Sequence, residues 1–500
     1  MITILLLFLI FLLLALQFWK EGRFQTERIQ QVLPGPPSLP IIGNLWDLRR
    51  KDLHIYLSKL GKTLGPIYRL RLWSQDIVVL NSTDLIKEAL VKRSLDFAGR
   101  PQTFTGNFIS FGGKDLSLGD YTAAWKVQKK LVHCAIQQGH GTAFEPVVVG
   151  EAKKLCEEFQ SYRGTVVVST ETFTMTTCNV ISSLIFGTTH DENHAELGDI
   201  HDSVVKLLNL WDSPSINILN TFPFLQNFPN SAWKDFLKAV EKRDIFVRQQ
   251  IQRHKETYQK GKIRDITDAM MKYFWDQEKG TSDLGEITEE HIHMAIVDLF
   301  VGGMETTASF LGWAIAFLIH RPEIQDRIYR EICDIVGDDR YPTYADRKKL
   351  LLLNATIAEV LRLRPIVPLS MMHRTTCDTS VAGYFIEKGT NVIPNLFGAH
   401  HDERKWSDPT RFRPERFLET ADAERTMRNV ITFGAGARLC MGEAIARMET
   451  FFFMAYLLKD FQFLPAEAGQ LPDLHGVLGF LLKVKPYRMM IIPRPSRQHY

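Results

Sequence analysis

Cysteine is scarce in this chain. The 500 residues include only six cysteines, and no two of them stand in a CxxC spacing. That scarcity argues against a disulfide framework and against a zinc-finger type of site, and it favours a reducing compartment.

An excess of charge of either sign is also lacking. The 60 lysines and arginines nearly balance the 57 aspartates and glutamates, which leaves a formal net charge of +3. Proteins that bind nucleic acid generally carry a much stronger positive balance to attract phosphates. We therefore predict no nucleic-acid partner.

Long hydrophobic runs are limited to the amino terminus. Ile2–Trp19 is an almost unbroken apolar stretch of 18 residues, which makes about 27 Å of helix at 1.5 Å per residue and is enough to cross a bilayer. No basic segment precedes it, so an anchor is favoured over a cleaved signal peptide. Lys20, Arg23 and Arg28 follow it. Since positive charge stays cytosolic, we predict a single-pass anchor over residues 1–20 and a cytosolic body.

Linkers and repeats are absent beyond residue 45. Residues 21–45 form a predicted linker that contains the stiff stretch Pro34-Gly35-Pro36-Pro37. Residues 46–500 are predicted to form one large, mainly α domain with small sheets. Strand-like segments occur at Ile67–Leu72, Ile77–Leu80, Ser380–Phe385 and Met489–Ile492.

The clearest predicted helix runs from about Glu289 to His320. Thr288 is a good N-cap, and Pro322 prevents the helix from continuing. The segment is apolar nearly all round, which predicts a buried helix that could form the wall of a cofactor pocket. Gly302 and Gly303 cost about 1 kcal/mol each in mid-helix, so close approach of a ligand is expected to compensate.

One cysteine stands in an unusual loop. Residues 433–442 read Phe-Gly-Ala-Gly-Ala-Arg-Leu-Cys-Met-Gly, with Cys440 among small residues. Glycines allow the backbone to approach a large flat ligand, and a thiolate is a suitable axial ligand for a haem iron that activates dioxygen. A structural cysteine in a glycine-rich turn is the alternative for an isolated cysteine, but the complete pattern favours the haem ligand.

The loop fills every fixed position of Phe-x-x-Gly-x-Arg-x-Cys-x-Gly, and the chain therefore resembles the cytochrome P450 monooxygenases. The resemblance implies the mainly α cytochrome P450 fold, haem b bound through Cys440, dioxygen as co-substrate, and electrons from NADPH through NADPH–cytochrome P450 reductase. It also implies the endoplasmic-reticulum membrane. An acidic donor could dock on a basic face, although a mixed solvated surface is an equal alternative; its candidates are Lys126, Lys129, Lys130, Arg425, Arg428 and Arg447.

Gly302-Gly303-Met304-Glu305-Thr306-Thr307 places an acid and an alcohol on the apolar helix. Buried acids are rare without a partner or a task. A kinked core helix with a satisfied polar pair is the alternative. In the family that this segment resembles, the acid and the alcohol guide protons to iron-bound oxygen, which implies catalytic roles for Glu305 and Thr306.

Glu359 and Arg362 stand three positions apart on a predicted helix, and Arg416 lies in a Pro-Glu-Arg-Phe stretch shortly before the cysteine loop. An ordinary surface pair would have little energetic value. The resemblance implies instead a buried structural lock that holds the loop beneath the haem.

Haem propionates need cationic or hydrogen-bonding partners. The resemblance places candidates at five positions in addition to Cys440: Arg100, Trp125, Lys129, His373 and Arg438. Lys129 replaces the commoner arginine of the family, so it would offer a point charge rather than a planar fork.

Within the family the chain resembles the vertebrate steroid 21-hydroxylases, on stretches that include residues 115–121, 241–244, 293–299 and 353–365. This implies hydroxylation of carbon 21 of progesterone and 17α-hydroxyprogesterone, and it implies that Arg243 binds the steroid 3-keto group. From composition alone, an exposed charge in a helix rich in lysine and arginine is the favoured interpretation of Arg243. Residues around Gln226 and residues 418–426 depart from that pattern, which leaves these loops open.

Other functions remain as alternatives. They are another steroid or xenobiotic monooxygenase such as a 17α-hydroxylase, a haem-thiolate isomerase or sensor, and a membrane-anchored scaffold. Glu305 and Thr306 argue against the sensor, and the cysteine loop argues against the scaffold. His291 and His293 point about 200° apart on a helix, so they are predicted to be capping or core residues rather than metal ligands.

Overall fold

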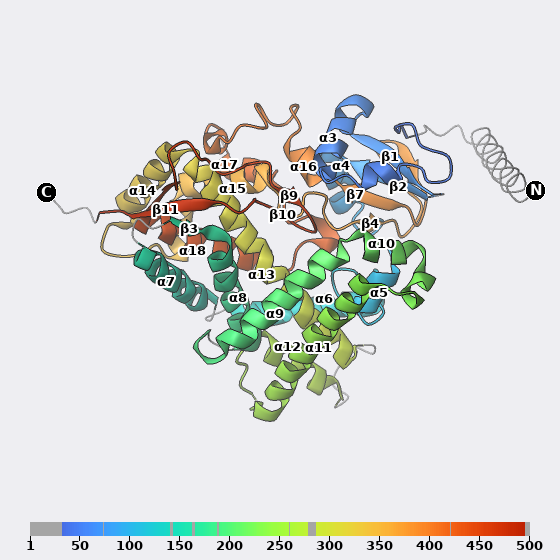
Figure 1. Cartoon of the computed structure of the whole chain (residues 1–500), viewed down its shortest axis with the longest axis horizontal. Coiled ribbons are helices and arrows are strands. Elements are labelled where there is room, and N and C mark those ends of the chain that lie inside the picture. The colour runs from blue at the N-terminus through green and yellow to red at the C-terminus, as the bar shows by residue number, and fades with distance from the viewer. Residues whose placement is uncertain are drawn as a thin grey trace, which may run out of the picture. The chain divides into compact units, whose positions relative to one another are not determined.

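The computed structural model describes residues 33–73, 75–140, 144–162, 166–187, 190–259, 261–278, 287–420 and 422–495. The predicted anchor over residues 1–20 lies outside these ranges. The described chain is mainly helical with small sheets, which confirms the predicted fold class (Figure 1). It forms two compact units, so the single domain expected over residues 46–500 stays a prediction.

The smaller unit comprises the described part of Met1–Pro101 together with Pro368–Pro409 and Gly434–Leu439. Its main sheet has the strand order β1-β2-β7-β4, in which β2 and β7 are parallel and the other pairs antiparallel. Its elements are α2 (Leu45–Leu48), α3 (Leu53–Leu64), β1 (Ile67–Leu72), β2 (Gln75–Leu80), α4 (Thr83–Lys87), the π-helix η1 (Glu88–Lys92), β4 (His373–Arg374), β5 (Thr379–Val381), β6 (Tyr384–Ile386), β7 (Asn391–Pro394), α16 (Leu396–His400) and η5 (Gly436–Arg438).

Alternating apolar residues explain how this sheet forms. Leu57 of α3 packs with Tyr68 and Leu70 of β1 and with Val79 of β2, and all four side chains are fully buried. The predicted strand at Ile67–Leu72 is confirmed, whereas the segment Ser380–Phe385 is the hairpin of β5 and β6 rather than one strand.

The larger unit comprises Gln102–Val367, Thr410–Phe433 and the described part of Cys440–Tyr500. Its helices up to the centre of the unit are α5 (Phe104–Ile109), α6 (Ala123–His140), α7 (Phe144–Tyr162), α8 (Ser169–Phe186), α9 (His190–Trp211), α10 (Pro214–Thr221), η2 (Pro223–Asn227), α11 (Ser231–Thr257), α12 (Ile266–Glu278) and α13 (Glu289–Ile319). The later ones are α14 (Pro322–Val336), η3 (Tyr344–Lys348), α15 (Leu351–Leu363), η4 (Pro414–Phe417), α17 (Ala423–Met427) and α18 (Glu443–Asp460).

Two small sheets complete this unit. One has the order β3-β11-β8 and the other pairs β9 with β10. Their bounds are β3 (Val166–Val168), β8 (Phe461–Pro465), β9 (Val477–Leu478), β10 (Leu482–Lys483) and β11 (Arg488–Pro493). The strand expected at Met489–Ile492 is confirmed within β11.

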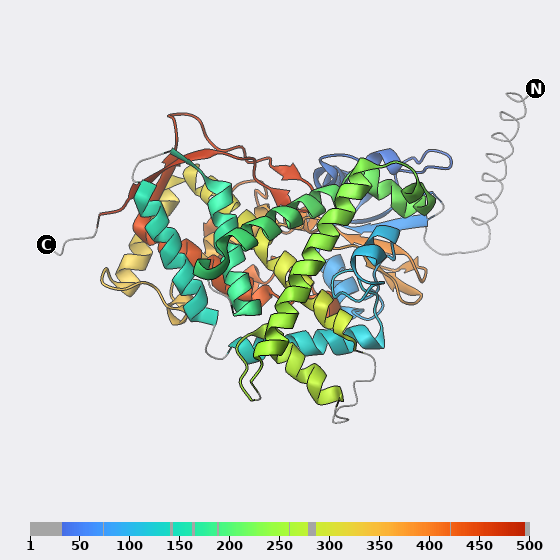
Figure 2. The ribbon, with the colours of Figure 1, turned by 60° about the horizontal axis from the view of Figure 1, so that its bottom comes forward.

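Helix α13 forms the centre of the larger unit, and Figures 1 and 2 show α8, α9 and α11 around it. His291 closes its amino end by accepting a hydrogen bond from the backbone N–H of Thr288 on Nδ1 at 3.1 Å. Among the described helices it alone is long and apolar enough to cross a membrane, but 72% of its most apolar window is buried in the protein. It is therefore a core helix, as the sequence predicts.

Candidate active site

The glycines of the loop before Cys440 are required by the backbone. Gly434 and Gly436 have φ angles of 75° and 66°, a region that favours glycine. A Cβ on Gly436 would lie only 1.6 Å from the carbonyl oxygen of Leu90 in η1. Ala437 donates its backbone N–H to Oγ of Ser94 at 2.8 Å. The loop is thereby fixed on the smaller unit as far as Leu439.

Cys440 is the first residue of the larger unit after this loop. Its backbone N–H donates to the carbonyl oxygen of Phe433 at 3.0 Å, and its side chain is exposed. Many protein groups nevertheless lie around the sulfur, and the desolvation that they cause raises the pKa of the thiol above its usual range. An accessible thiol with a raised pKa becomes a thiolate when a metal ion displaces its proton.

One strip of α13 is open to solvent although the rest of the helix is buried. Between His291 and Ile319 only Gly302 is exposed, and nothing lies within 4 Å of the position that its Cβ would take. Thr306, one turn later, is partly exposed and donates its hydroxyl to the carbonyl oxygen of Gly302 at 2.8 Å. Gly302 is therefore the position at which a ligand has room to approach the helix closely, as the sequence predicts.

Gly303 has a different explanation, which corrects the expectation from the sequence. A Cβ at this position would lie 2.6 Å from Cγ1 of Ile181 in α8. The second glycine is needed because α8 packs closely against α13, not because a ligand approaches.

Glu305 is buried between two basic side chains. His201 of α9 places Nε2 at 2.9 Å from Oε1, and Lys483 of β10 donates to Oε2. Burial alone would raise the pKa of Glu305, but these hydrogen bonds and charges hold it below its usual value. The acid that the sequence places beside Thr306 is thus a carboxylate near neutral pH.

The three basic residues that the smaller unit contributes to the predicted haem contacts lie together. Arg100 donates Nη1 to the carbonyl oxygens of Met371 and Met372 at 2.9 and 2.8 Å. Arg438 donates Nε to the carbonyl oxygen of Ala98 at 2.7 Å.

His373, the third of these, lies with Nδ1 at 2.7 Å from the carbonyl oxygen of Phe97. Burial, followed by the charges of Arg100 and Arg438, lowers the pKa of His373 well below its usual range. The ring is therefore neutral, and it lies in a positive field that suits an anionic ligand.

Trp125 and Lys129, the other predicted propionate contacts, lie one turn apart on α6 in the larger unit. The indole N–H of Trp125 donates to the carbonyl oxygen of Leu116 at 3.0 Å. The ammonium of Lys129 lies 5.5 Å from the centre of the Trp125 ring, within the range of a cation–π contact. The Trp125 ring therefore orients Lys129. The single hydrogen-bond donor of Trp125, its indole N–H, is already bound to Leu116.

Glu359, Arg362 and Arg416 are brought together in the core of the larger unit. Arg362 donates Nε and Nη2 to the two carboxylate oxygens of Glu359 at 2.8 and 2.9 Å. Arg416 donates Nε to Oε1 at 3.0 Å. The backbone N–H of Arg413 reaches the same oxygen at 3.0 Å. This network joins α15 to the segment that precedes the cysteine loop.

Arg243 is buried in α11 rather than exposed on a charged surface, with 3% of its surface accessible. It donates Nε to Asp244 at 2.9 Å and Nη2 to the carbonyl oxygen of Ile109 at 2.9 Å. Within the described residues Nη1 makes no hydrogen bond. Asp244 is also bonded to Nε2 of His293 at 3.1 Å, which confirms that His293 is a core residue.

Comparisons with known proteins agree with this geometry. The family model described as Cytochrome P450 matches residues 33–491. The chain belongs to the cytochrome P450 family. A bovine protein named steroid 21-hydroxylase is 43% identical to this P450 over 98% of the chain and 96% of its own length. The human protein of that name is 42% identical, with 92% of each chain covered.

A solved structure shows the same fold. A zebrafish cytochrome P450 with progesterone superimposes with a TM-score of 0.78 and 31% sequence identity. The match covers 88% of this P450 and 99% of the zebrafish chain.

The residues of this P450 fit a haem with a thiolate ligand. The larger unit offers an accessible thiol at Cys440 and an open strip of α13 at Gly302, where nothing lies within 4 Å of the position that a Cβ would take. A haem would be held by Cys440, and the roles of the basic residues as partners of its propionates stay predictions.

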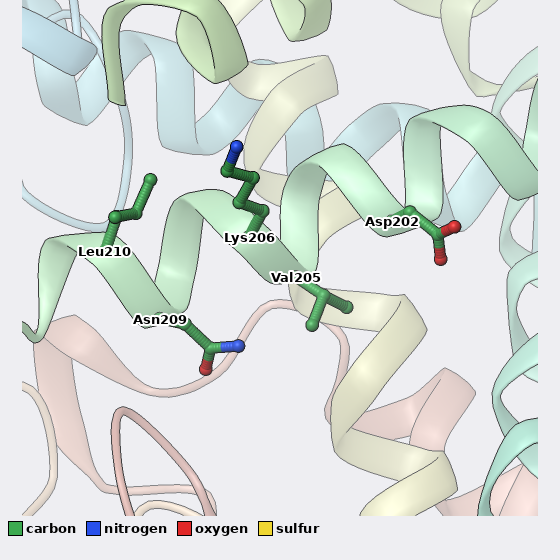
Figure 3. Close-up of a pocket in the computed structure, with 5 residues that line it drawn as sticks. All are labelled: Asp202, Val205, Lys206, Asn209 and Leu210. Carbon is green, nitrogen blue, oxygen red and sulfur yellow. The ribbon is translucent and has the colours of Figure 1, made fainter. Parts of the chain in front are cut away.

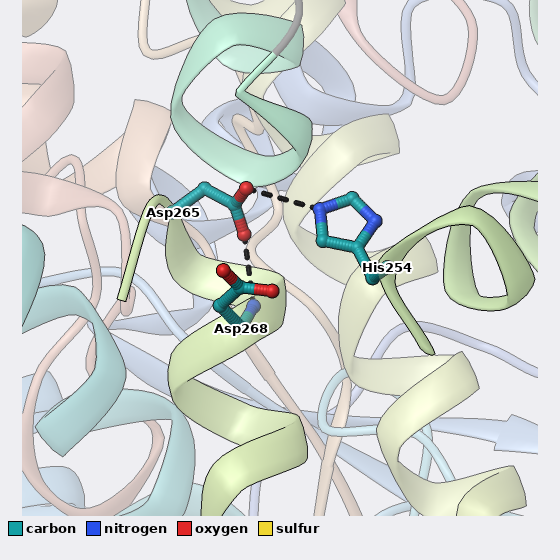
Figure 4. Close-up of side chains that lie close together, drawn as sticks. All are labelled: His254, Asp265 and Asp268. Carbon is teal, nitrogen blue, oxygen red and sulfur yellow. Dashed lines mark hydrogen bonds and ion pairs between the residues drawn. The ribbon is translucent and has the colours of Figure 1, made fainter. Parts of the chain in front are cut away.

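A second cluster of potential metal ligands is better explained as an ion-pair network. His254, Asp265 and Asp268 are buried, and their ligand atoms lie within 4.8 Å of one another (Figure 4). Asp268 is bound by the guanidinium of Arg264 at 2.6 and 2.8 Å. His254 contacts Asp265 at 3.0 Å and the carbonyl oxygen of Gln250 at 2.7 Å. These partners occupy the atoms that a metal would need.

Sequence reasoning missed the partners of the predicted site residues. His201 and Lys483 hold Glu305, and they lie 104 and 178 positions away from it. No spacing pattern links residues so far apart. Tertiary packing alone identifies them.

Proposed function

We propose that this P450 hydroxylates carbon 21 of progesterone and of 17α-hydroxyprogesterone, giving 11-deoxycorticosterone and 11-deoxycortisol in glucocorticoid and mineralocorticoid synthesis. The observation that carries the proposal is identity of 41–43% to eight curated proteins, each named steroid 21-hydroxylase, over 91–99% of this chain. The reaction converts a methyl group, dioxygen, NADPH and a proton into a primary alcohol, water and NADP⁺.

The site residues supply binding and proton transfer in this proposal. Bound haem iron with a thiolate ligand supplies dioxygen activation, with two electrons from NADPH through NADPH–cytochrome P450 reductase. Thr306 offers its hydroxyl at the open strip of α13, and Glu305 supplies protons to Thr306. Glu359, Arg362 and Arg416 hold the segment that leads into the cysteine loop.

The proposed location is the endoplasmic-reticulum membrane, with the catalytic body in the cytosol. The apolar run Ile2–Trp19 supports it as an anchor. Exposed apolar side chains in α10, η2 and the residues next to η2 offer a second membrane contact, namely Ile218, Phe222, Phe224 and Phe228. Trp233, near the start of α11, is a buried core residue and is not part of this exposed group.

Reconstitution tests the function directly. The purified protein is combined with reductase, NADPH and progesterone, and the hydroxylated carbon of the product is identified by mass spectrometry and NMR. We expect 21-hydroxyprogesterone, and we expect the reduced protein with carbon monoxide to show the Soret band of a thiolate-ligated haem. A product hydroxylated at carbon 17 instead would refute the proposal, and an unshifted Soret band would refute the role of Cys440.

Arg243 is the proposed partner of the steroid 3-keto group, through Nη1. A hydrogen bond from a charged donor contributes about 1.5–3 kcal/mol, so we expect Arg243→Ala to lower kcat/KM for progesterone by about 10- to 100-fold. An analogue that lacks the 3-oxo group should be turned over equally by both proteins. Arg248→Ala, on the exposed face of α11, is the matched control and should behave as wild type. Equal losses for both steroids would contradict the assignment.

A further inference from the structure

The partners of Glu305 form a chain from the interior to solvent. The side chain of Glu305 is 5% exposed, that of His201 is 16% exposed, and that of Asp202 is 84% exposed. His201 contacts Glu305 through Nε2 at 2.9 Å and Asp202 through Nδ1 at 3.2 Å. One imidazole therefore spans the distance between the buried carboxylate and the surface.

The outer end of this chain opens into a hollow on the surface of α9. The hollow has a volume of about 430 Å³ and is lined by Asp202, Val205, Lys206, Asn209 and Leu210 (Figure 3). Water in it has direct access to the Asp202 carboxylate. Solvent can thus reach the outer end of the chain while Asp202 remains hydrogen-bonded to His201.

The charged and titratable groups that face Glu305 come from three elements. His201 belongs to α9, Lys483 to β10 and Cys178 to α8. Burial, and to a smaller extent the charge of Glu305, raises the pKa of Cys178 to about 12, so this thiol stays neutral. Burial opposes the charge of His201, but its hydrogen bonds to Glu305 and Asp202 raise its pKa above the usual value.

We propose that His201 carries protons from solvent at Asp202 to Glu305, and that Lys483 keeps Glu305 ionised so that it passes each proton on to Thr306. The inference rests on the proposed function, because only an oxygen-activating site consumes these protons. It assigns His201 and Lys483 as positioning and proton-transfer residues.

Each transfer moves one proton across the imidazole. Nδ1 gains a proton from the Asp202 side, the Nε2–H bond breaks, and an O–H bond forms on Oε1 of Glu305. The ring returns to its first state by a flip about Cβ–Cγ. The ammonium of Lys483 on Oε2 disfavours the protonated acid. The proton therefore leaves Glu305 for Oγ1 of Thr306, which releases its own hydroxyl proton toward the open strip, and the carboxylate is restored.

The first test does not depend on turnover. In protein with isotopically labelled histidine, studied as the reduced carbon monoxide complex, NMR follows the titration of His201, assigned by loss of its signal in His201→Gln. We expect a pKa above the ordinary value of about 6.5 and a clear fall in Glu305→Gln. An unchanged His201 titration in Glu305→Gln would overturn the inference.

The second test measures proton delivery in the reconstituted enzyme. Glutamine at position 201 retains a hydrogen-bond donor but cannot relay a proton. A positioned acid–base group contributes about 10²–10⁴-fold, and because water can partly substitute, we expect His201→Gln to lower turnover by about tenfold or more. We also expect a larger solvent isotope effect and NADPH lost to peroxide.

His133→Gln, at an exposed position of α6, is the matched control and should behave as wild type. An intact Soret band for the carbon monoxide complex shows that each variant is folded. If His201→Gln keeps the wild-type rate, isotope effect and coupling, the inference is overturned and the proposed function is unaffected. Failure of the wild-type protein to hydroxylate progesterone would instead refute the proposed function, and the NMR titration would still test the His201–Glu305 contact.

Discussion

Two buried carboxyl groups, one on α13 and one in contact with it, differ in protonation. On one side Glu305 is held by His201 and Lys483, which keep its pKa below the usual value in spite of burial. On the other side Glu449 of α18 accepts a hydrogen bond from the hydroxyl of Thr307 at 2.6 Å, and burial raises its pKa to about 8. Both acids are buried, with 4% and 1% of their surface accessible, but only Glu305 has basic partners in the described part of the chain.

The difference teaches that burial alone does not define the task of an acid. Oε1 of Glu449 is buried and has no hydrogen-bond partner in the described structure, which suits a neutral carboxyl group. Glu359 is the opposite extreme, since it is fully buried and binds two guanidinium groups. The three acids differ in whether basic groups contact them, and three substitutions test what that difference does.

The largest effect is expected from Glu359→Gln. The substitution keeps the size of the side chain but leaves the guanidinium groups of Arg362 and Arg416 without their buried counter-charge. Breaking a buried ion pair in this way costs about 3–5 kcal/mol. Urea unfolding should show this loss. The control is Glu424→Gln, which removes an exposed pair with Arg428 and should not change the unfolding midpoint measurably. Equal effects of the two substitutions would contradict the comparison.

Glu449→Gln should change how stability depends on pH. Between the unfolded pKa of about 4.3 and the folded pKa of about 8, the folded state binds one proton more than the unfolded state. Wild-type stability therefore falls as pH rises, by about 1.4 kcal/mol per pH unit from this group. Urea unfolding at several values between pH 5 and pH 8 should give a flatter profile for the variant. Parallel profiles would show that Glu449 is ionised in the folded protein.

Glu305→Gln should have the smallest effect on stability. The pH dependence that Glu305 contributes to stability is opposite in sign to that of Glu449. Its folded pKa is lowered, so the carboxylate stabilises the fold above the unfolded pKa, and this contribution is lost as pH falls through the folded pKa. We expect the variant to be about 1 kcal/mol less stable near pH 7 and to converge with wild type in acid, once the pH falls through the lowered folded pKa of Glu305. A difference that persists in acid would show that Glu305 stabilises the fold through packing rather than charge.

The fold class and the central helix could be predicted from sequence because their signals are local. The apolar character of Glu289–His320 and the stop at Pro322 predict α13 to within one residue at its carboxyl end. The sequence predicts one strand where residues 379–386 form a hairpin of two. Both strands are short, and Gly383, with φ of 82°, is the only turn signal between them.

The candidate site was predictable only where motifs fix it. Cys440 and Thr306 stand in such motifs, and the structure leaves both accessible. The protonation of Glu305 and Glu449 could not be predicted, because it depends on His201, Lys483 and Thr307, whose proximity follows from packing. The burial of Arg243 also needed the structure, since its neighbours in sequence are mostly charged.

The parallel pairing of β2 with β7 has a consequence for synthesis of the protein. During synthesis, residues 75–80 can pair with residues 391–394 only after these have been made. The smaller unit is complete only when residues 434–439 have been added. Contacts so distant in sequence form slowly and late. Most of the larger unit therefore emerges from the ribosome before the smaller unit can close, and β2 must stay protected from aggregation throughout. Termination of translation before residue 391 would leave this strand permanently without its parallel neighbour.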